Sequence, residues 1–563
     1  MRKLPYDRAT TTMDIFPMCS YCRREYENPL DRRYYSQTNS CYDCGILMQL
    51  FEGQNQVIDV SQNKIIAKIV EAWSIGKIVA IKGIGGYLLT CDARNEQAIQ
   101  QLRDRKHRPS KPFALMFSTL KQIEEVAHLD DLEKATLQSP VSPIVLLNTK
   151  QEKVADYLAL DAIAPNLNQV GVMLPYTPLF DLLLKKLGQP IIATSGNISN
   201  SPIVFNDQKA LTELSKIADV VVTNNRPIVV PQDDSVNKFT LFNKQQIILR
   251  RSRGLAPTYI NADLKWSNQT ILATGAMLKS TFSLLQQENT YVSQYLGDLS
   301  SFDTQLNYKH TVNHFLKLFS KKPEAVLVDK HPEYSATVFG QDLAREIGCS
   351  VHSIQHHVAH FGAVLGENNL LHSKAPVLGV VWDGTGLGDD QQIWGGEFFT
   401  YHNYNFSRTT HFDYFDFILG DKMPKEPRIS ALSVSHRVEG ATAILQPKFS
   451  PAEWSIYQKL LAKNNRLKTS SVGRIFDAVV SLLGMMDRQT YAGEAAMQLE
   501  KVATSYFVQH GLAFEGHYFS DANSFKSIPT KSLFAKIVAD IQSGKTKAFI
   551  AAKFHYSLAQ LVK

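Results

Sequence analysis

Four cysteines near the start of the chain constrain its folding more than any other feature. Cys19, Cys22, Cys41 and Cys44 form a C-x2-C-x18-C-x2-C pattern. Each pair lies on a short turn from which two thiolates reach one ion, and two such turns complete the closed tetrahedral site of structural zinc. Because all four ligands are thiolates, no position is left for water or substrate. The spacing therefore predicts a zinc ribbon whose metal stabilises a segment too small for a core of its own.

The overall composition is that of an ordinary globular protein. Hydrophobic residues make up 44% and charged residues 20% of the 563 residues, which excludes disordered, collagen-like and coiled-coil chains. No apolar run approaches the roughly 18 residues that cross a membrane, and the N-terminus lacks the apolar core of a signal peptide. Since four of the six cysteines cluster at a metal site, we expect a cytoplasmic chain without a membrane partner. The formal charge of +7 is spread along the chain and decides little about partners.

Beyond the cysteines, short apolar runs alternate with amphipathic segments. This alternation predicts multidomain α/β architecture. Helices are expected at residues 66–76 and 95–107, and strands at 77–87, 142–148, 189–197 and 218–223. A second α/β block begins near residue 270, and polar stretches at 54–63 and 261–269 are expected to be linkers. The predicted division is a zinc-binding segment at 1–50, an α/β domain at 57–257 and a further α/β domain at 268–563.

A glycine-rich turn follows the first apolar strand. Lys82 is succeeded by Gly83, Ile84, Gly85 and Gly86. Glycines at such a place let backbone N–H groups approach phosphate oxygens, with the lysine as a point charge. The segment is not a Walker A loop, and a plain tight turn explains it equally well.

A cluster of cations is the sharper feature of this block. Arg103, Arg105, Lys106, Arg108 and Lys111 lie within nine residues, which end at Pro109 and Pro112. Such a run is usually a solvated basic face. Here the prolines are expected to hold the cations in a fixed loop, where Lys106, Arg108 and Lys111 would neutralise a triphosphate or an acyl phosphate.

Two polar segments complete the candidate pocket. Thr194, Ser195 and Asn197 follow an apolar strand, and the C-terminal edges of strands are where α/β sheets place ligands. Asp234 and Ser235, in the segment Asp233–Ser235, would hold a magnesium ion.

At this point the chain resembles a known family. The segments KGIGG, RDRKHRPSKPFALM, APNLNQVGVMLPYTPL, ATSGN, QDDSV and LRRSRGLAP resemble the YrdC-like domain of the HypF family, carbamoyltransferases of [NiFe]-hydrogenase maturation. The cysteine segment resembles the second of that family's two zinc fingers. The resemblance implies nucleotide or substrate binding by Lys82, Gly85, Gly86, Thr194, Ser195, Asn197, Arg226, Asp234 and Ser235.

In the second block, two histidines lie one helical turn apart. His356 and His360 project from one face of a helix and can share a metal ion, and Asp383 ends a following strand. His357 is expected to point elsewhere and to contact substrate.

Several glycines follow or flank acidic residues in this block. Gly384, Thr385 and Gly386 are expected to form a turn after Asp383, and each of the remaining acid–glycine segments is also compatible with a plain turn. Together these segments resemble the family's TsaD-like domain, which has the actin/Hsp70-type ATPase fold. The resemblance assigns His356, His360 and Asp383 to a second metal, zinc or iron, and the nucleotide to Gly384, Thr385, Gly386, Glu397, Asp477, Gly493 and Glu494.

The resemblance also implies a reaction and its partners. ATP, with magnesium, and carbamoyl phosphate or carbamate would form carbamoyl-adenylate, and the carbamoyl group would pass to the C-terminal cysteine of a HypE-like protein. One alternative is an enzyme of tRNA threonylcarbamoyl-adenosine synthesis, although no clustered basic face for nucleic acid is seen outside the cation cluster. The other is an inactive HypE-binding scaffold.

The ends of the chain differ from the family pattern. The family usually begins with an acylphosphatase domain and a first zinc finger, and it continues past the last helix of this sequence. We therefore expect the TsaD-like domain to be partial and full activity of the chain alone to be in question.

Overall fold

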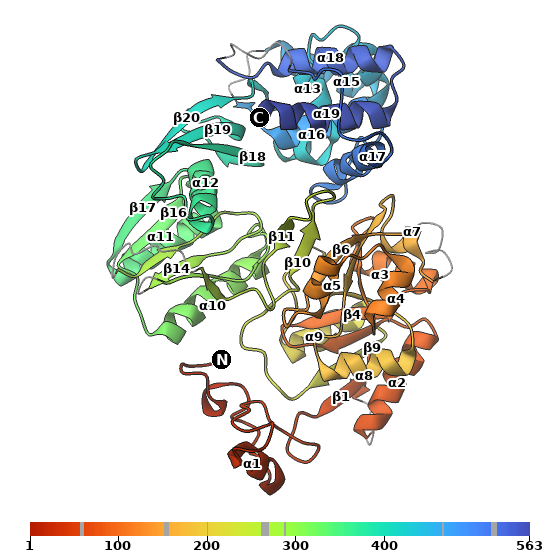
Figure 1. Cartoon of the computed structure of the whole chain (residues 1–563), viewed down its shortest axis with the longest axis vertical. Helices are drawn as coiled ribbons and strands as arrows, with labels where there is room; N and C mark the ends of the chain where they lie inside the picture. Colours follow the sequence, from red (N-terminus) through yellow and green to blue (C-terminus); the bar gives the residue numbers. More distant parts are fainter. Residues whose placement is uncertain are drawn as a thin grey trace. The chain divides into compact units, whose positions relative to one another are not determined.

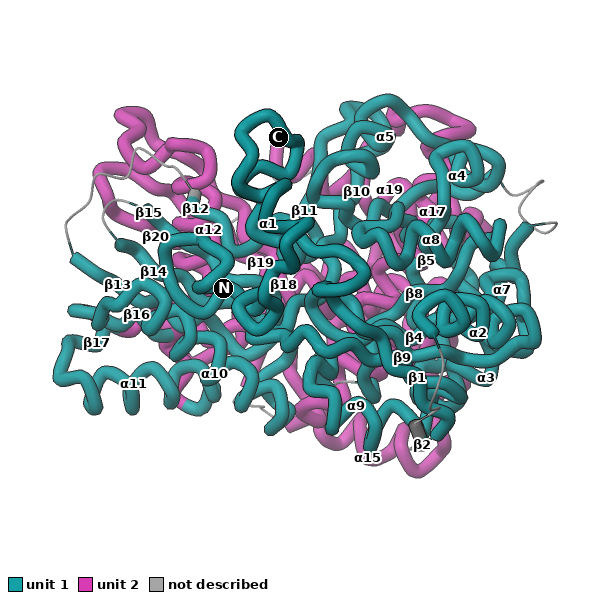
Figure 2. The backbone as a smooth tube through the Cα atoms, turned by 90° about the horizontal axis from the view of Figure 1, so that it is seen from below, with its two compact units in different colours: residues 1–261, 266–328, 333–352 teal, residues 262–265, 329–332, 353–563 magenta. Residues whose placement is uncertain are grey.

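A computed structural model describes residues 1–53, 55–56, 61–150, 157–199, 201–260, 269–286, 289–463, 467–519 and 526–563. The chain forms two compact units, coloured separately in Figure 2: residues 1–261, 266–328 and 333–352, and residues 262–265, 329–332 and 353–563. Residues 57 and 268, where two of our predicted domains begin, lie outside the described residues, and those domain boundaries stay a prediction. No described helix is long and apolar enough to cross a membrane.

The first unit opens with a segment of little regular structure. It contains a 3-10 turn at Arg8–Thr10 and the helix α1 at Ser20–Glu27. The Arg8 guanidinium donates to the carbonyl oxygens of Phe16, Gln37 and Asn39, at 2.7, 3.0 and 2.7 Å. One half-buried arginine side chain thus holds together loop segments that belong to no sheet.

An 11-stranded mixed sheet follows, in the order β11-β10-β6-β7-β5-β8-β4-β3-β9-β1-β2. Its strands are β1 Met48–Glu52, β2 Asn55–Gln56, β3 Val79–Lys82, β4 Tyr87–Asp92, β5 Ala114–Met116, β6 Ile144–Asn148, β7 Gln169–Met173, β8 Ile191–Ser195, β9 Val220–Asn224, β10 Val236–Phe239 and β11 Gln246–Arg250. The pairs β3–β9, β5–β7 and β6–β10 are parallel and the other pairs are antiparallel. The expected strands and α/β architecture are confirmed.

Helices cover this sheet with amphipathic faces. They are α2 Gln62–Ser74, α3 Glu96–Lys106, α4 Leu120–Val126, α5 Asp131–Gln138, α7 Leu160–Ile163, α8 Pro178–Leu187 and α9 Asp207–Glu213, with a 3-10 turn at Leu214–Lys216. Ile65, Ile69 and Trp73 of α2 and Phe180 and Leu184 of α8 recur at helical spacing and are buried in one core. The two helices expected at 66–76 and 95–107 are α2 and α3. Because α2 begins at Gln62, the end of the expected linker at 54–63 is helical.

A six-stranded sheet has the order β12-β15-β14-β13-β16-β17. The boundary between the two units falls within its strands β16 and β17. Its strands are β12 Thr258–Ile260, β13 Ile271–Ala273, β14 Ser283–Gln286, β15 Asn289–Val292, β16 Ala325–Asp329 and β17 Ser350–Ile354, and its helices are α10 Phe302–Phe319 and α11 Ser335–Ile347. Tyr308, Val312 and Phe315 of α10 pack with Val326 and Val328 of β16. Asp329, the last residue of β16, already belongs to the second unit.

The second unit combines a small sheet with a helical cluster. Its sheet contains β18 Val377–Leu387, β19 Ile393–His402, β20 Asn405–His411, β21 Phe415–Asp416 and β22 Lys468–Thr469. Its helices are α12 His356–Glu367, α13 Pro427–Val434, α14 Ala441–Leu445, α15 Pro451–Ala462, α16 Val472–Leu482, α17 Glu494–His510, α18 Thr530–Gln542 and α19 Lys547–Val562, with 3-10 turns at Gly420–Lys425 and Gln446–Lys448. In Figure 1 the blue helices gather beside one end of β18–β20. Their buried residues form one large core, in which α13 and α16 lie centrally.

One expectation about this unit is wrong. We expected a glycine turn at Gly384–Gly386, but β18 continues through these residues to Leu387. The pairing of β18 with β19 shifts register between Trp382 and Gly386. A bulge of this kind re-aims a side chain without ending the strand, and it is Asp383 that lies inside it.

Candidate functional site

The four cysteines of the ribbon come together as their spacing predicts. The Sγ atoms of Cys19 and Cys41 lie 3.6 Å apart, those of Cys41 and Cys44 3.8 Å, and those of Cys22 and Cys44 3.6 Å. A tetrahedron of sulfurs about 2.3 Å from zinc has edges of roughly 3.8 Å. The donor set and these distances fit structural zinc.

In the first unit, the cations of the cluster are divided between α3 and the loop that follows it. We expected the prolines to hold all five cations in a fixed loop, but Arg103, Arg105 and Lys106 lie in α3, the helix expected at 95–107, which ends at His107 in a left-handed conformation. The Arg103 guanidinium is buried against the ring of Phe113 and donates to the carbonyl oxygens of Arg108, Pro109, Lys111, Ala162 and Ile163. This arginine is therefore an anchor of the loop and not one of its ligand-facing cations.

Lys106 is buried as well. Its ammonium donates to the backbone oxygens of Ser195 (2.7 Å) and Asn197 (2.6 Å) and to the side-chain oxygen of Asn197. Burial lowers the pKa of Lys106 well below its usual value, and the nearby Arg108 lowers it further. Asn197 also accepts from the Ser195 hydroxyl at 2.9 Å. The structure thus brings three predicted site residues together, with Lys106 holding the turn between the other two.

Arg108 and Lys111 lie in a group of like charges. Arg108 approaches the Thr194 hydroxyl at 3.4 Å. Limited access of water, together with repulsion from Arg108, Arg250 and Lys279, lowers the pKa of Lys111 to about 8, and Asp233 opposes this shift. Cations therefore come together from the α3–β5 loop, from β11 and from the segment after β13. They outnumber the anions beside them. This arrangement suits a polyanionic ligand.

The glycine turn is explained in part by packing. A Cβ on Gly85 would lie 2.3 Å from the carbonyl oxygen of Gln232, and one on Gly86 would lie 2.6 Å from Ile203. The Lys82 ammonium is buried and paired with Asp207 at 2.7 Å. Lys82 is thus neutralised inside the protein, whereas a phosphate-binding lysine was expected.

Three further predicted residues have partners of their own. Arg226 donates to the Thr12 hydroxyl at 3.0 Å, and burial lowers its pKa. The carboxylate of Asp234 pairs with Arg253 at 2.8 Å, and Asp233 pairs with Arg250 at 2.6 Å. Ser235 is fully buried and donates to the Arg253 carbonyl. Because arginines neutralise both carboxylates, the structure does not support the magnesium site expected at Asp233–Ser235.

In the second unit, the predicted metal ligands do converge. The Nε2 atoms of His356 and His360 lie 3.2 Å apart, and the Oδ2 atom of Asp383 lies 3.4 Å from the first and 4.0 Å from the second. Helix α12 begins at His356, where the preceding Gln355 caps it, so the imidazoles of His356 and His360 project from its first two turns.

Two observations indicate that this group fits a metal ion. The Oδ2 atom of Asp383 is buried and has no hydrogen-bond partner, as expected of an oxygen reserved for a cation. Two imidazole nitrogens and one carboxylate oxygen are also the donors that catalytic zinc and non-haem iron use, with a position left open. Burial alone lowers the pKa of His356, but the hydrogen bond to Asp329 and the negative charges of Asp329 and Asp383 outweigh it and raise the pKa to about 9.

His357 does not behave as we expected. It is fully buried, and its Nε2 atom lies 3.3 Å from the Oδ1 atom of Asp383. The expectation that it points away to contact substrate is wrong, because the bulge in β18 brings Asp383 over both neighbouring histidines. Asp329, which lies 2.7 Å from Nδ1 of His356, was missed altogether; its only sequence signal is its place at the end of an apolar strand.

In the acid–glycine segments, the described contacts of the acidic side chains are mostly with neighbouring groups of the protein. Glu397 is fully buried and paired with Arg408, Asp477 pairs with Arg474 at 2.7 Å, and Glu494 accepts from the backbone of Thr490. Gly493 caps α17 with a positive φ of 84°. Thr385 is exposed. Among the described residues, the group of potential metal ligands contains none of these three carboxylates.

One segment does adjoin the metal ligands. The Ser471 hydroxyl, at the start of α16, donates to the carbonyl of Gly384 at 2.9 Å. A Cβ on Gly473 would lie 3.1 Å from the Cα of Gly384. The N-terminus of α16 is therefore held against the bulge that carries Asp383.

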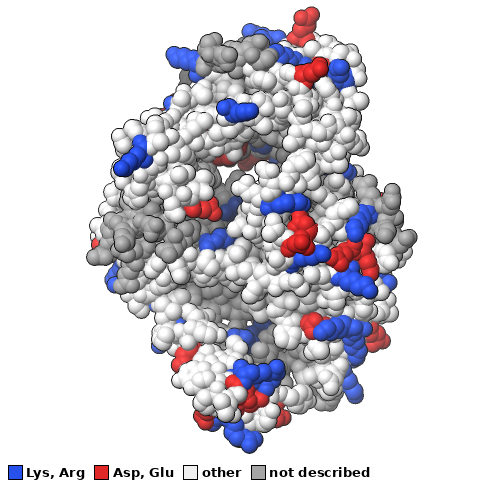
Figure 3. Space-filling view, viewed as in Figure 1, with Lys and Arg blue, Asp and Glu red and all other residues white. Residues whose placement is uncertain are grey.

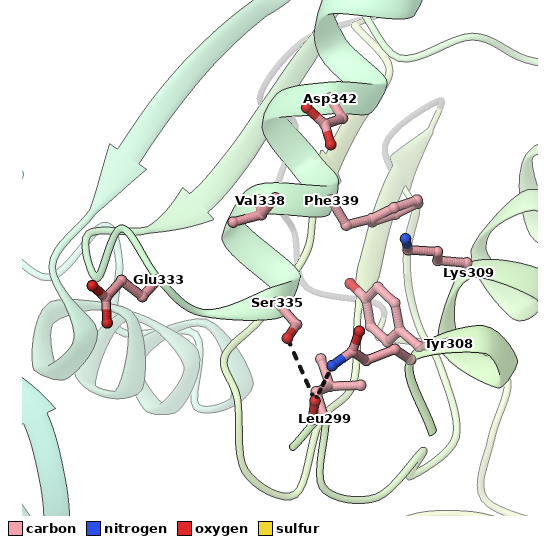
Figure 4. A pocket seen from close by; sticks show the side chains of 9 residues that line it. Leu299, Tyr308, Lys309, Glu333, Ser335, Val338, Phe339 and Asp342 are labelled. Atoms are coloured by element: carbon pink, nitrogen blue, oxygen red, sulfur yellow. Dashed lines mark hydrogen bonds between the residues drawn. The ribbon is translucent and has the colours of Figure 1, made fainter. Parts of the chain in front are cut away.

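Cavities open on the described surface beside the metal ligands and between α10 and α11. One of about 310 Å³ borders His360 and Asp383 and is otherwise lined by mostly apolar residues of α12 and β18. The other, about 160 Å³, lies between α10 and α11 (Figure 4). There Gln305 and Ser335 donate to the Leu299 carbonyl, and Asp342 pairs with Arg345. The first cavity gives access to the metal ligands, whereas the second has polar groups already engaged by neighbours.

Charge on the visible surface is mixed. On the face drawn in Figure 3, lysine and arginine side chains are scattered among aspartate and glutamate side chains. That nucleic acid is not a partner stays a prediction.

Four family models match successive segments of the chain. The HypF finger matches residues 18–51, and a model of Sua5, yciO and yrdC proteins described as telomere recombination matches 71–252. The HypF Kae1-like domain matches 266–367, and the second subdomain of a carbamoyltransferase Kae1-like domain matches 379–563.

Whole proteins are similar as well. Carbamoyltransferase HypF of Synechocystis is 38% identical over 589 residues, covering 99% of this chain and 73% of the relative. Carbamoyltransferase HypF of Rhodobacter capsulatus is 36% identical, covering 89% of this chain and 66% of the relative. A crystal structure of full-length HypF in the phosphate- and nucleotide-bound form superposes with a TM-score of 0.89 at 33% identity, covering 100% of this chain and 71% of that one. The chain thus spans about two thirds to three quarters of these relatives.

Proposed function

The chain belongs to the HypF family of carbamoyltransferases, and from this premise we propose that it activates a carbamoyl group with ATP and transfers it to the C-terminal cysteine of a HypE-like protein. We assign activation to residues 71–252 and transfer to the Kae1-like part of the chain. We further assign the reaction to the cytosol.

The strongest support for the first step is the convergence of Arg108, Lys111 and Arg250. In this step a carbamate oxygen attacks the α-phosphorus of ATP, carbamoyl-adenylate forms and pyrophosphate leaves. Negative charge develops on the phosphate oxygens, and fixed guanidinium and ammonium groups stabilise it. Magnesium would accompany the ATP. Carbamoyl phosphate is the expected source of the carbamate.

Lys106 contributes to this step indirectly. Its ammonium is occupied by the oxygens of Ser195 and Asn197, so it shapes the turn on which those polar groups lie. Arg108 contacts Thr194 on the neighbouring part of β8. The residues that meet the phosphates are therefore Arg108 and Lys111, with Thr194, Ser195 and Asn197 around them.

The second step uses the group in the second unit. His356, His360 and Asp383 would hold a zinc or iron ion, which when bound supplies a Lewis acid for the carbonyl or phosphate oxygens of the substrate. The thiolate of the partner's cysteine attacks the carbamoyl carbon, AMP leaves and a thiocarbamate forms. The cavity of about 310 Å³ beside His360 and Asp383 offers room for the incoming groups.

Exchange of labelled pyrophosphate into ATP tests the first step. Carbamate is supplied directly from bicarbonate and ammonium, so that the result does not depend on hydrolysis of carbamoyl phosphate. We expect carbamate-dependent exchange that is lost in Arg108→Ala and retained in Lys121→Ala, which removes an exposed lysine of α4. Exchange that requires threonine would instead favour threonylcarbamoyl-adenylate synthesis, and no exchange under either condition would contradict the proposal.

Mass measurement of a HypE-like protein tests the second step. Incubation with the chain, ATP and carbamate should add one carbamoyl group to the partner's C-terminal cysteine. A partner whose cysteine is changed to serine should stay unmodified. Activation without any transfer would restrict the proposal to the first step.

A further inference from the structure

The metal ligands of the second unit are held by residues that do not themselves face the ion. His356 presents Nε2 to His360 and Asp383 and turns Nδ1 away from them. Asp383 presents Oδ2 to His356 and His360 and turns Oδ1 toward His357. Each of the two inner ligands therefore has one atom for the ion and one for a neighbour. Those neighbours are Asp329 and His357.

Asp329 determines which nitrogen of His356 carries a proton. Its Oδ2 atom lies 2.7 Å from Nδ1 of His356, and its Oδ1 atom accepts the backbone N–H of His331 at 2.8 Å. The carboxylate is 8% exposed and accepts without donating. Nδ1 must then be the protonated nitrogen when His356 is neutral, which leaves the lone pair on Nε2, toward Asp383 and His360.

His357 is held in the opposite tautomer. Its Nδ1 atom lies 3.1 Å from the amide nitrogen of Gln355. The orientation of that amide is fixed, because its oxygen accepts the N–H of Val358 and its nitrogen donates to the carbonyl of Leu387. Since the amide nitrogen only donates, Nδ1 of His357 accepts and Nε2 carries the proton.

The protonated Nε2 of His357 faces Oδ1 of Asp383 at 3.3 Å. One oxygen of the carboxylate is thereby satisfied, and the other, Oδ2, is the buried oxygen without a partner. His357 thus fixes the rotation of the Asp383 carboxylate. Its complete burial excludes a direct role in binding substrate.

We propose that Asp329 and the Gln355–His357 pair are positioning residues of this metal site, which hold adjacent histidines in opposite tautomers so that Nε2 of His356 and Oδ2 of Asp383 both face the ion. The inference rests on the metal site of the proposed function. It assigns roles to three residues that hold no metal themselves. Loss of such outer partners typically weakens metal binding by about 10- to 100-fold.

Cobalt(II) titration of the full chain tests the assignment, after the cysteine ribbon has been filled with zinc. Affinity is measured by competition with a chelator, and the visible absorption of cobalt reports the geometry of its ligands. We expect Asp329→Ala and His357→Leu to weaken cobalt binding by at least tenfold. His357→Gln keeps an N–H donor near the position of Nε2 and should restore binding to within about threefold of the parent.

Matched controls separate positioning from general destabilisation. His352→Ala removes an exposed histidine of β17 and should leave cobalt affinity unchanged. Thermal unfolding without metal identifies variants that merely lose stability. Cobalt affinities of Asp329→Ala and His357→Leu within threefold of the parent would overturn the positioning roles while leaving the metal site intact. A parent that binds cobalt no better than His356→Ala would instead overturn the metal site, and the positioning roles with it.

Discussion

The ammonium of Lys106 lies 2.7 Å from the backbone oxygen of Ser195, which is 89 residues away in the sequence. It also holds both oxygens of Asn197. A lysine that resembles a phosphate ligand in the sequence is therefore a buried brace between α3 and the end of β8. This relationship separates the roles of the cations in the cluster and makes them testable.

Replacement of Lys106 by methionine should destabilise the first unit. The change keeps most of the side-chain volume but leaves the buried oxygens of Ser195 and Asn197 without a donor, at a cost of about 1–3 kcal/mol for each unsatisfied group. Thermal unfolding followed by tyrosine and tryptophan fluorescence should show a midpoint several degrees lower. An unchanged midpoint together with lost pyrophosphate exchange would mean that the ammonium serves the ligand after all.

Replacement of Arg108 by alanine should act on catalysis instead. Losing one charge-assisted phosphate contact costs about 2–4 kcal/mol of transition-state stabilisation, or roughly 30- to 1000-fold in exchange rate. The unfolding midpoint should fall less than in Lys106→Met. Rates within about threefold of the parent would indicate that the cluster is only a solvated face.

Binding of ATP should weaken as the pH rises through about 8. The pKa of Lys111 is lowered to about 8, so its ammonium is charged below that pH and neutral above it. Bound phosphates favour the charged form, and affinity is therefore highest on the acidic side. Titration calorimetry between pH 7 and 9 measures this dependence. In Lys111→Arg the charge persists, and a pH profile as steep as that of the parent would assign the titration to another group.

Gly386 should be essential for metal binding, whereas Gly384 should tolerate alanine. A Cβ at Gly386 would lie 2.6 Å from the rings of both His356 and His357, but one at Gly384 has no neighbour within 4 Å. Overpacking of this kind usually costs about 1–3 kcal/mol. Gly386→Ala should therefore weaken cobalt binding while Gly384→Ala does not. Equal affinities of the two variants would contradict the close approach of the rings.

Changing both Cys19 and Cys41 to serine should remove one zinc ion per chain. Each pair of ligands then loses one thiolate, and the segment around α1 loses the metal that stabilises it. Elemental analysis measures the zinc content, and limited proteolysis detects unfolding of residues 1–50. The double change of Cys91 and Cys349, which lie outside the ribbon, should leave the content unchanged. Zinc retained in the first variant would exclude the ribbon.

The sequence by itself determined the features whose chemistry is local. Four cysteines at ribbon spacing and two histidines one helical turn apart bring their ligand atoms together through short stretches of backbone, and the structure confirms both groups. The alternation of apolar and amphipathic segments likewise predicts α/β architecture, because the hydrophobic period that defines each helix or strand lies within its own residues.

Only the tertiary structure decided the roles that depend on distant partners. Lys82 and Lys106 resemble phosphate ligands until folding brings Asp207 to the first and Ser195 and Asn197 to the second. Asp329 acquires its role when its carboxylate meets the Nδ1 atom of His356. His357 acquires its role when the bulge in β18 aims Asp383 inward. A buried charge must be paired or hydrogen-bonded, and which group satisfies it depends on contacts across tens of residues that no local spacing records.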